Sequence, residues 1–177
     1  MARPSAPLIW RERAAEAALA LIDECGLENF NLARVARALG VSPSSLYHHF
    51  KDKSELLQEV ACVMLAQIRD AWPPGQSFEE RIIGRCVATR RTLLRHSNAA
   101  SLILRFFPRY LLLGAYDRVV AASPYPTRIR MAIIDAIEKY TFGAALFEAF
   151  ARSRDVKQMP DVDGVLYPSL PRAGAGN

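Results

Sequence analysis

The chain has 177 residues, of which 51% are hydrophobic and 23% charged, so it can bury a core and is not largely disordered. Its formal net charge is +5 at pH 7, yet residues 1–53 hold seven basic and six acidic side chains, so the surplus is not concentrated in this segment. The net charge by itself therefore supports a nucleic-acid partner only weakly.

Cysteine spacing and hydropathy exclude several other classes of protein. Cys25, Cys62 and Cys86 lie far apart in apolar runs, without the spacing of a zinc site or a disulfide framework. No basic segment followed by an apolar run opens the chain, and no apolar run is long enough to span a bilayer. We expect a cytoplasmic protein with reduced, buried thiols.

Helical periodicity dominates the chain and alternating strand patterns are absent, which predicts an all-α fold. A first helix is expected over residues 8–25, ended by Gly26. Two short helices joined by a tight turn are expected over residues 31–50. The signals for their boundaries are two caps, a glycine that favours a left-handed turn and a proline at a first helical position: Asn31, Ser42, Gly40 and Pro43.

The sequence of the second helix predicts one face toward the core and one face toward solvent. Leu46 and Phe50, four residues apart, can anchor it to the core. The side chains then left facing outward are Ser44, Ser45, Tyr47 and His48. Such a helix pair delivers its second helix into a DNA major groove. Tyr47 has an alternative reading as an aromatic side chain packed at the helix junction.

Later helices are expected over residues 54–71, 78–96, 99–107, 109–122 and 127–152, and irregular chain from residue 155 onward. The predicted domains are a unit with the helix pair at 1–53, a larger helical unit at 54–154 and an irregular tail at 155–177. The family resemblance described below assigns DNA binding to the first unit, and effector binding and dimerisation to the second. The segment from Trp72 to Gly75, which contains two prolines, marks the strongest break between helices.

The helix over 127–152 is apolar around much of its girth and therefore needs cover on two sides. Another subunit is the natural second cover, although ordinary core packing explains the pattern equally well. The stripe assigned to a dimer interface consists of Ile134, Thr141, Ala145, Leu146, Ala149 and Phe150.

Aromatic side chains with scattered polar groups between residues 78 and 150 are typical of a ligand pocket between helices. The candidate effector-binding residues are His96, Arg105, Phe106, Tyr110, Tyr140 and Phe147. A plain aromatic core accounts for each of them individually as well.

Residues 8–60 closely resemble the DNA-binding module of the TetR family of bacterial transcriptional regulators. The resemblance rests on the combined spacing of Glu24-Cys25-Gly26, Val35-Ala36, Leu39-Gly40-Val41-Ser42, Leu46-Tyr47-His48-His49-Phe50, Lys53 and Glu55-Leu56-Leu57. It implies a homodimeric repressor of the bacterial cytoplasm whose C-terminal domain dimerises and binds a small, largely apolar or aromatic effector. It also implies a final helix that pairs with the preceding long helix across the dimer interface. The sequence after residue 155 lacks helical periodicity, so we expect a smaller dimer or a shortened sequence.

Carried over by position, the resemblance assigns DNA contacts to two groups of residues. Those expected to face bases are Ser42, Pro43, Ser44, Ser45 and His48. Those expected near phosphates are Asn31, Tyr47, His49 and Lys53, with Arg34 either there or simply solvated. No arginine or lysine stands among the base-facing residues, so specificity should rest on weaker contacts and on DNA shape.

Enzyme, metal and cofactor chemistry have no matching pattern in the sequence. No nucleophile with a base at workable spacing and no glycine-rich phosphate loop is found. His48 and His49 are adjacent, and neighbouring residues on a helix point about 100° apart, which disfavours a shared metal ion. The predicted partners are thus double-stranded DNA, a second copy of the chain and a small effector. The alternative is a DNA-binding protein without effector control.

Overall fold

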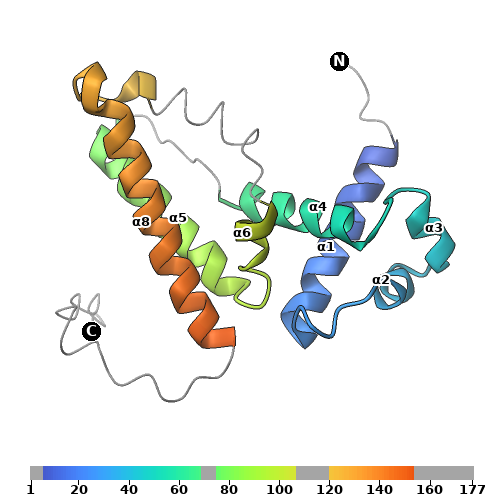
Figure 1. The fold of residues 1–177 in the computed structure, drawn as a ribbon. Coiled ribbons are helices and arrows are strands. Elements are labelled where there is room, and N and C mark those ends of the chain that lie inside the picture. Colours follow the sequence, from blue (N-terminus) through green and yellow to red (C-terminus); the bar gives the residue numbers. More distant parts are fainter. Residues whose placement is uncertain (1–5, 69–74, 107–119, 154–177) are drawn as a thin grey trace, which may run out of the picture.

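The computed structural model describes residues 6–68, 75–106 and 120–153, and every regular element in these ranges is a helix (Figure 1). The helices are α1 (Ala6–Cys25), α2 (Leu32–Leu39), α3 (Pro43–Tyr47), α4 (Lys53–Ala66), α5 (Phe78–Arg95), α6 (Leu102–Phe106) and α8 (Thr127–Ser153). The all-α prediction is confirmed. Among the described residues, no helix is both long and apolar enough to cross a membrane.

Helices α1, α2 and α3 with the start of α4 form one unit, which we call the reading head. α1 packs along α4, and α2 packs against α1 and α3. The α1 side of this core consists of small and branched side chains that are fully buried, among them Ala14, Ala18 and Ile22. Small alanines allow two helices to approach closely, so α1 holds α4 at the base of the head.

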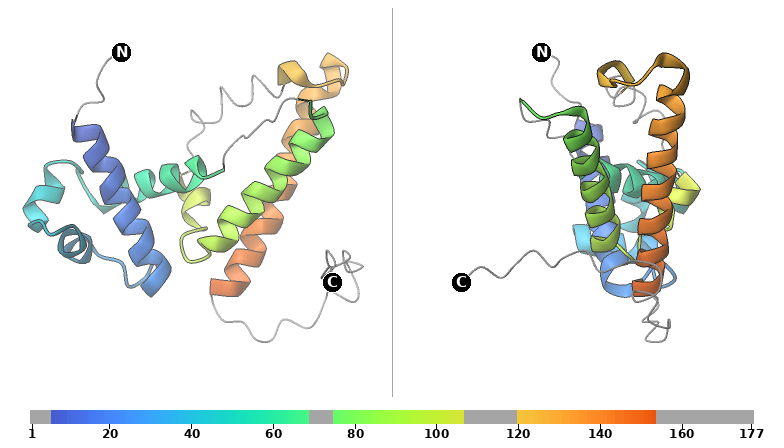
Figure 2. Two further views of the ribbon diagram at one scale, coloured as in Figure 1. Left: turned by 180° about the vertical axis from the view of Figure 1, so that it is seen from behind. Right: turned by 90° about the vertical axis from the view of Figure 1, so that its left-hand side faces the viewer.

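Helices α5, α6 and α8 form the second unit, which we call the body. α5 and α8 lie side by side and run in the same direction (Figure 2). The Phe78 ring meets Tyr125 edge-on at their beginnings, and Arg90 of α5 pairs with Glu148 further along α8. α6 packs against α4, so buried apolar residues continue from the head into the body across the predicted boundary at residue 53.

Two predicted helix boundaries differ from the structure. α4 ends at Ala66, with Gln67 as its cap, and not at residue 71. Residues 67–71 contain neither glycine nor proline, so periodicity alone placed the end at the next strong breaker. α6 begins at Leu102 and not at Ala99, because residues 97–101 form turns after α5. Most of the helix predicted over 109–122 lies outside the described residues, and residues 120–122 are helical.

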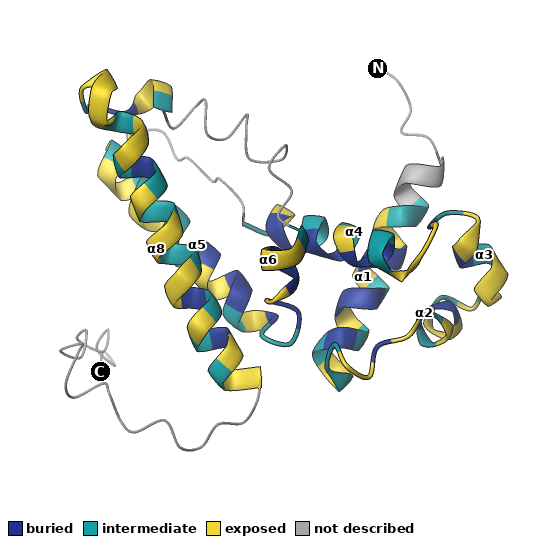
Figure 3. Ribbon diagram, viewed as in Figure 1, coloured by how far each residue is buried: buried dark blue, intermediate teal, exposed yellow. Residues whose placement is uncertain are grey.

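Burial differs between the two faces of α8 (Figure 3). Ile134, Ala145 and Ala149 are buried, while Tyr140 and Phe147 on the opposite side are 65% and 64% exposed. One face of this helix is therefore covered by the chain itself, and the other carries large apolar side chains that are mostly exposed.

Candidate nucleic-acid interface and core pocket

Capping interactions define both ends of α2 as the sequence predicts. The Asn31 side chain accepts a hydrogen bond from the backbone N–H of Arg34 at 3.0 Å. Gly40 adopts φ 69°, a left-handed conformation, and its N–H reaches the carbonyls of the last turn. Phe30 and Val35 are both buried, as expected for a hydrophobic staple. Because the Asn31 oxygen already caps the helix, only its amide hydrogens remain for a phosphate.

Helix α3 begins where predicted and is anchored as predicted. Ser42 is the N-cap, its Oγ accepts from the backbone N–H of Ser45 at 3.4 Å, and Pro43 occupies the first helical position. Leu46 and Phe50 are almost fully buried. Tyr47 is 57% exposed, which excludes the alternative in which it packs at the helix junction.

The outward surface of α3 carries short hydroxyls, a phenol and an imidazole. Ser44, Tyr47 and His48 are exposed, and Ser45 is half-buried. The Ser42 hydroxyl lies 2.8 Å from the Ser44 hydroxyl and 3.0 Å from that of Ser45. These hydroxyls pair with one another in the free protein, so a contact with a base requires them to reorient.

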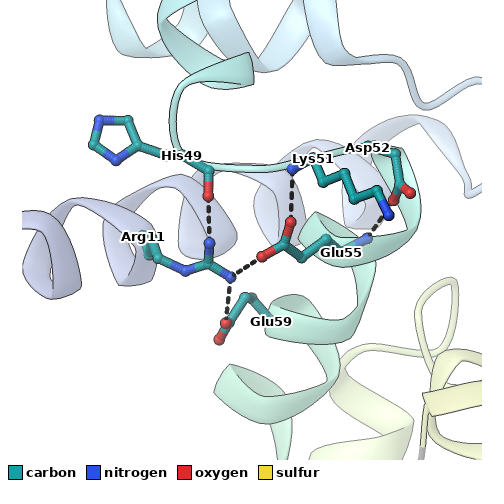
Figure 4. Close-up of polar contacts among 6 residues, drawn as sticks. All are labelled: Arg11, His49, Lys51, Asp52, Glu55 and Glu59. Carbon is teal, nitrogen blue, oxygen red and sulfur yellow. Dashed lines mark hydrogen bonds and ion pairs between the residues drawn. The ribbon is translucent and has the colours of Figure 1, made fainter.

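A cluster that we call the polar hub ties α3 to α1 and α4 (Figure 4). Its centre is the guanidinium of Arg11 on α1, which donates to the backbone carbonyl of His49 just after α3. The same guanidinium lies 2.8 Å from a carboxylate oxygen of Glu55 and 2.8 Å from one of Glu59, both on α4. The sequence prediction missed this cluster, although carboxylates four apart on one helix face were a visible signal.

Electrostatics within the polar hub favours the charged forms of Arg11 and Glu55. Burial opposes the charge on Arg11, but hydrogen bonds with Glu59 and Glu55 raise its pKa above the usual value. The backbone N–H of Lys51, followed by the Arg11 side chain, lowers the pKa of Glu55. The hub therefore stays ionised at neutral pH and holds the end of α3 in place.

His49 and Lys53, both predicted near phosphates, already have partners within the head. The His49 ring stacks on Trp10 with 4.0 Å between centroids. The Lys53 ammonium donates to the backbone carbonyl of Phe30 at 2.8 Å and lies over the Phe30 ring. Arg34 is half-buried, and its guanidinium reaches the carbonyl of Asn29 at 3.5 Å. These three side chains therefore stabilise the head through contacts within it.

Comparisons with known proteins agree with this arrangement of helices. Residues 15–60 match the family described as "Bacterial regulatory proteins, tetR family". SCO0253, a TetR-family transcriptional regulator from Streptomyces coelicolor, has a similar structure, with 29% identity and a TM-score of 0.68 over 83% of this chain and 87% of that one. This chain belongs to the TetR family.

Two further relatives of this TetR-family chain are informative. Tetracycline repressor protein class D of Escherichia coli is 30% identical over 141 residues, which cover 77% of this chain and 65% of that protein. This chain thus spans about two thirds of the length of that repressor. BioQ, solved with its double-stranded DNA operator, has 26% identity and a TM-score of 0.65, over 83% of this chain and 92% of that one.

A small cavity lies between α5 and α8 and has a volume of about 40 Å³. Its lining combines apolar side chains, small polar groups and two charged groups: Ile82, Arg85, Cys86, Thr89, Ile134, Ile137, Glu138, Thr141 and Phe142. Burial raises the pKa of Glu138, while the charges of Arg85 and Lys139 act in the opposite direction. Within the described residues, no cluster of His, Cys, Asp or Glu is arranged to hold a metal ion.

None of the five predicted effector-binding residues that the structure describes lines this cavity. His96 is buried where α1, α4 and α5 meet, and Arg105 lies over the ring of Phe106 on α6. Tyr140 and Phe147 are exposed on α8, and Tyr110 lies outside the described residues. Aromatic content was therefore a poor guide to the cavity, whose lining is mostly aliphatic and small polar.

The stripe assigned to a dimer interface lies mainly on the inner side of α8. Ile134, Ala145 and Ala149 are buried within the chain, and the Thr141 hydroxyl donates to the Cys86 sulfur of α5 at 3.2 Å. Leu146 is half-buried, and Phe150 is the exposed member of the set. Because this helix is apolar around much of its girth, the sequence does not reveal which side faces the core. The burial of this stripe moves the candidate interface to the opposite face of α8.

Proposed function

We propose that this chain is a sequence-specific DNA-binding transcriptional regulator that places α3 in the major groove of a double-stranded operator. The observation that carries the proposal is the outer surface of α3, where Ser44, Tyr47 and His48 are exposed while Leu46 and Phe50 anchor the helix from behind. The operator bound to BioQ, a structural relative, supports the same partner. Residues 1–53 carry the reading function, and residues 54–154 carry dimerisation and control.

The homodimer forms through the exposed face of α8. This face presents the large apolar side chains of Ile129, Tyr140 and Phe147, together with the small residues Ala136 and Gly143. Gly143 has open space where a Cβ would be, so a partner helix can approach closely there. A dimer would place the two α3 helices in successive major grooves, about 34–36 Å apart.

A small effector releases the repressor by binding between α5 and α8. The cavity offers an apolar wall with hydroxyl groups and a Glu138 carboxyl whose raised pKa favours its neutral, hydrogen-bonding form. Its position also supports the proposal, because α8 carries the dimer face and α5 continues toward the head. The name of the tetracycline repressors is consistent with control by a small molecule.

The second candidate function is DNA binding in the bacterial cytoplasm without effector control. The volume of the cavity, about 40 Å³, favours it, because such a space holds only a few water molecules before the helices move apart. Neither candidate function involves catalysis.

Selection of binding sites from a library of duplex DNA with a random central region tests the main proposal. The expected product is a palindrome whose half-sites lie one helical turn apart and which binds at least 100-fold more tightly than scrambled duplex at one fixed salt concentration. Salt-dependent binding that hardly varies with sequence would favour an architectural protein. Absence of binding to any duplex would refute both candidates.

A further inference from the structure

His96 joins three helices at the boundary between the reading head and the body. It caps the C-terminus of α5 and is only 8% exposed. Its ring Nδ1 lies 2.7 Å from the Oδ2 of Asp23 in the last turn of α1. Its Nε2 lies 2.9 Å from the Oε1 of Gln67, the residue that caps the C-terminus of α4. Asn98 adds a second link by donating to the backbone carbonyl of Asp23.

The two ring nitrogens of His96 face oxygen atoms, Oδ2 of Asp23 and Oε1 of Gln67. Both hydrogen bonds can form at once only if each nitrogen carries a proton. A ring that donates from both nitrogens carries a proton on each and is a cation. A neutral ring has one N–H, so it must lose one of the two contacts or make Gln67 rotate its amide. Among the described residues, the other carboxylate oxygen of Asp23 is buried without a hydrogen-bond partner, so this carboxylate depends on the ring.

The charges around His96 come mainly from α1. The groove beside it is lined by Asp23 together with Glu12 and Glu16, all on α1. From α5, Arg95 faces the same groove, and α4 contributes Gln67 and the uncharged side chains of Val63 and Ala66. The carboxylates favour a cationic ring and Arg95 opposes it. The His96 ring thus lies between a carboxylate that attracts positive charge and an amide oxygen that can accept a hydrogen bond from a second ring N–H.

We propose that His96 is a proton-dependent latch that holds the end of α1 in the reading head to the ends of α4 and α5. In the protonated state, both ring nitrogens donate and the three helix ends are joined. Because the Asp23 carboxylate can only accept a hydrogen bond, the neutral ring keeps its N–H on Nδ1 and loses the one on Nε2. The contact with Gln67 then breaks, and the end of α4 loosens from the ends of α1 and α5. The beginning of α4 is held by the polar hub through Glu55 and Glu59, so the latch controls only the end of α4.

Hydrogen exchange followed by mass spectrometry tests the latch without DNA or effector. Between about pH 6 and pH 8, after correction for intrinsic exchange, protection of the amides in residues 62–67 at the end of α4 should fall roughly tenfold, as expected for the loss of one polar contact. Unchanged protection, which is the result if Gln67 rotates its amide and keeps the contact, would overturn the proposal. In His96→Gln, which cannot gain or lose a proton, the fall should disappear. An equal fall in His96→Gln and in the unaltered chain would overturn the proposal.

Matched variants separate the latch from other sources of pH dependence. His48→Gln and His49→Gln replace the other two histidines of the chain and should keep the fall in protection. Arg90→Gln breaks an exposed ion pair between α5 and α8 and should keep it as well. Loss of the fall in any of these three, with retention in His96→Gln, would overturn the assignment to His96.

A spectroscopic measurement on the unaltered chain covers the case in which His96→Gln does not fold. With ¹⁵N-labelled histidine, the ring nitrogens of His96 should both show the chemical shift of protonated nitrogen at about pH 6, and one of them should lose it on raising the pH. Signals of the three histidines are assigned with the His48→Gln and His49→Gln variants. A neutral His96 ring at about pH 6 would refute the latch.

Discussion

The reading head and the body of this protein are stabilised in different ways. In the head, each short helix has a side-chain cap or a left-handed glycine, and the polar hub joins α3 to α1 and α4. In the body, α8 buries one face against α5 and leaves the aromatic side chains of Tyr140 and Phe147 exposed on the other. A DNA reader must keep its geometry fixed, whereas the proposed dimer and effector would each add contacts to the body.

Phe50→Ala should have the largest effect, because this ring is almost fully buried beneath α3. Truncation of a buried phenylalanine costs about 3–5 kcal/mol of unfolding free energy, and chemical denaturation would measure it. Phe150→Ala is a matched control, since that ring is 53% exposed, and it should cost far less in the monomer. Equal losses in the two variants would contradict the contrast between a packed head and an incomplete body.

Phe147→Glu should disrupt the dimer while leaving each subunit folded. A charge at the centre of an apolar interface should weaken association by at least about 100-fold, which analytical ultracentrifugation can measure. Lys139→Gln on the same helix serves as the control. It removes a charge from an exposed ion pair with Asp135. Unchanged association of Phe147→Glu would place the interface elsewhere.

Arg11→Met should loosen the head by removing the centre of the polar hub. We expect a loss of about 1–2 kcal/mol in unfolding free energy, because two half-exposed carboxylates and one carbonyl lose a charged partner. Glu79→Gln is the control, because it replaces an exposed carboxylate in the first turn of α5. A larger effect of Glu79→Gln would show that the hub does not stabilise the head.

The pH dependence of stability should also report on the polar hub. The pKa of Glu55 is lowered in the folded state, so its contribution is present above the unfolded value of about 4.3 and is lost as the pH falls through the folded value. Lowering the pH below about 4.5 should therefore reduce the unfolding free energy of Glu55→Gln less than that of the unaltered chain, which chemical denaturation at each pH would measure. Parallel curves for the two proteins would contradict the assigned pKa direction.

His48→Ala and Lys53→Ala should have smaller and different effects on DNA binding. His48→Ala should change the preferred base at one position of each half-site by about tenfold, since the side chain is exposed on α3. Lys53→Ala should weaken binding to all duplexes about equally and reduce the salt dependence. Binding measured against the selected palindrome and a scrambled duplex distinguishes the two effects. If neither variant altered binding, α3 would not be the reading helix.

Gly143→Ala should have the smallest effect. Alanine favours a helix by about 1 kcal/mol over glycine, and no described residue lies within 4 Å of the added methyl group. We expect a small gain in the stability of the monomer together with weaker association, because the methyl group would meet the partner helix. Gly84→Ala on α5 is the control, with equally open space, and should leave association unchanged.

Local signals explain why the head could be predicted so closely. Asn31, Gly40, Ser42 and Pro43 act on backbone groups within a few residues of themselves, so their effects are readable from sequence order. The end of α4 was misplaced because no breaker stands near Gln67, whose position is stabilised by a histidine 29 residues away. Contacts between distant segments leave no comparable local pattern.

By itself, the amino-acid sequence determined the helical fold, the positions of the short helices in the head and the family, because periodicity and capping depend on neighbouring residues. The tertiary structure decided which stripe of α8 faces inward, where the cavity lies and what surrounds Arg11 and His96. These features depend on which helix covers which face, and an apolar stripe is equally suited to a core and to a partner. Packing between distant helices makes that choice.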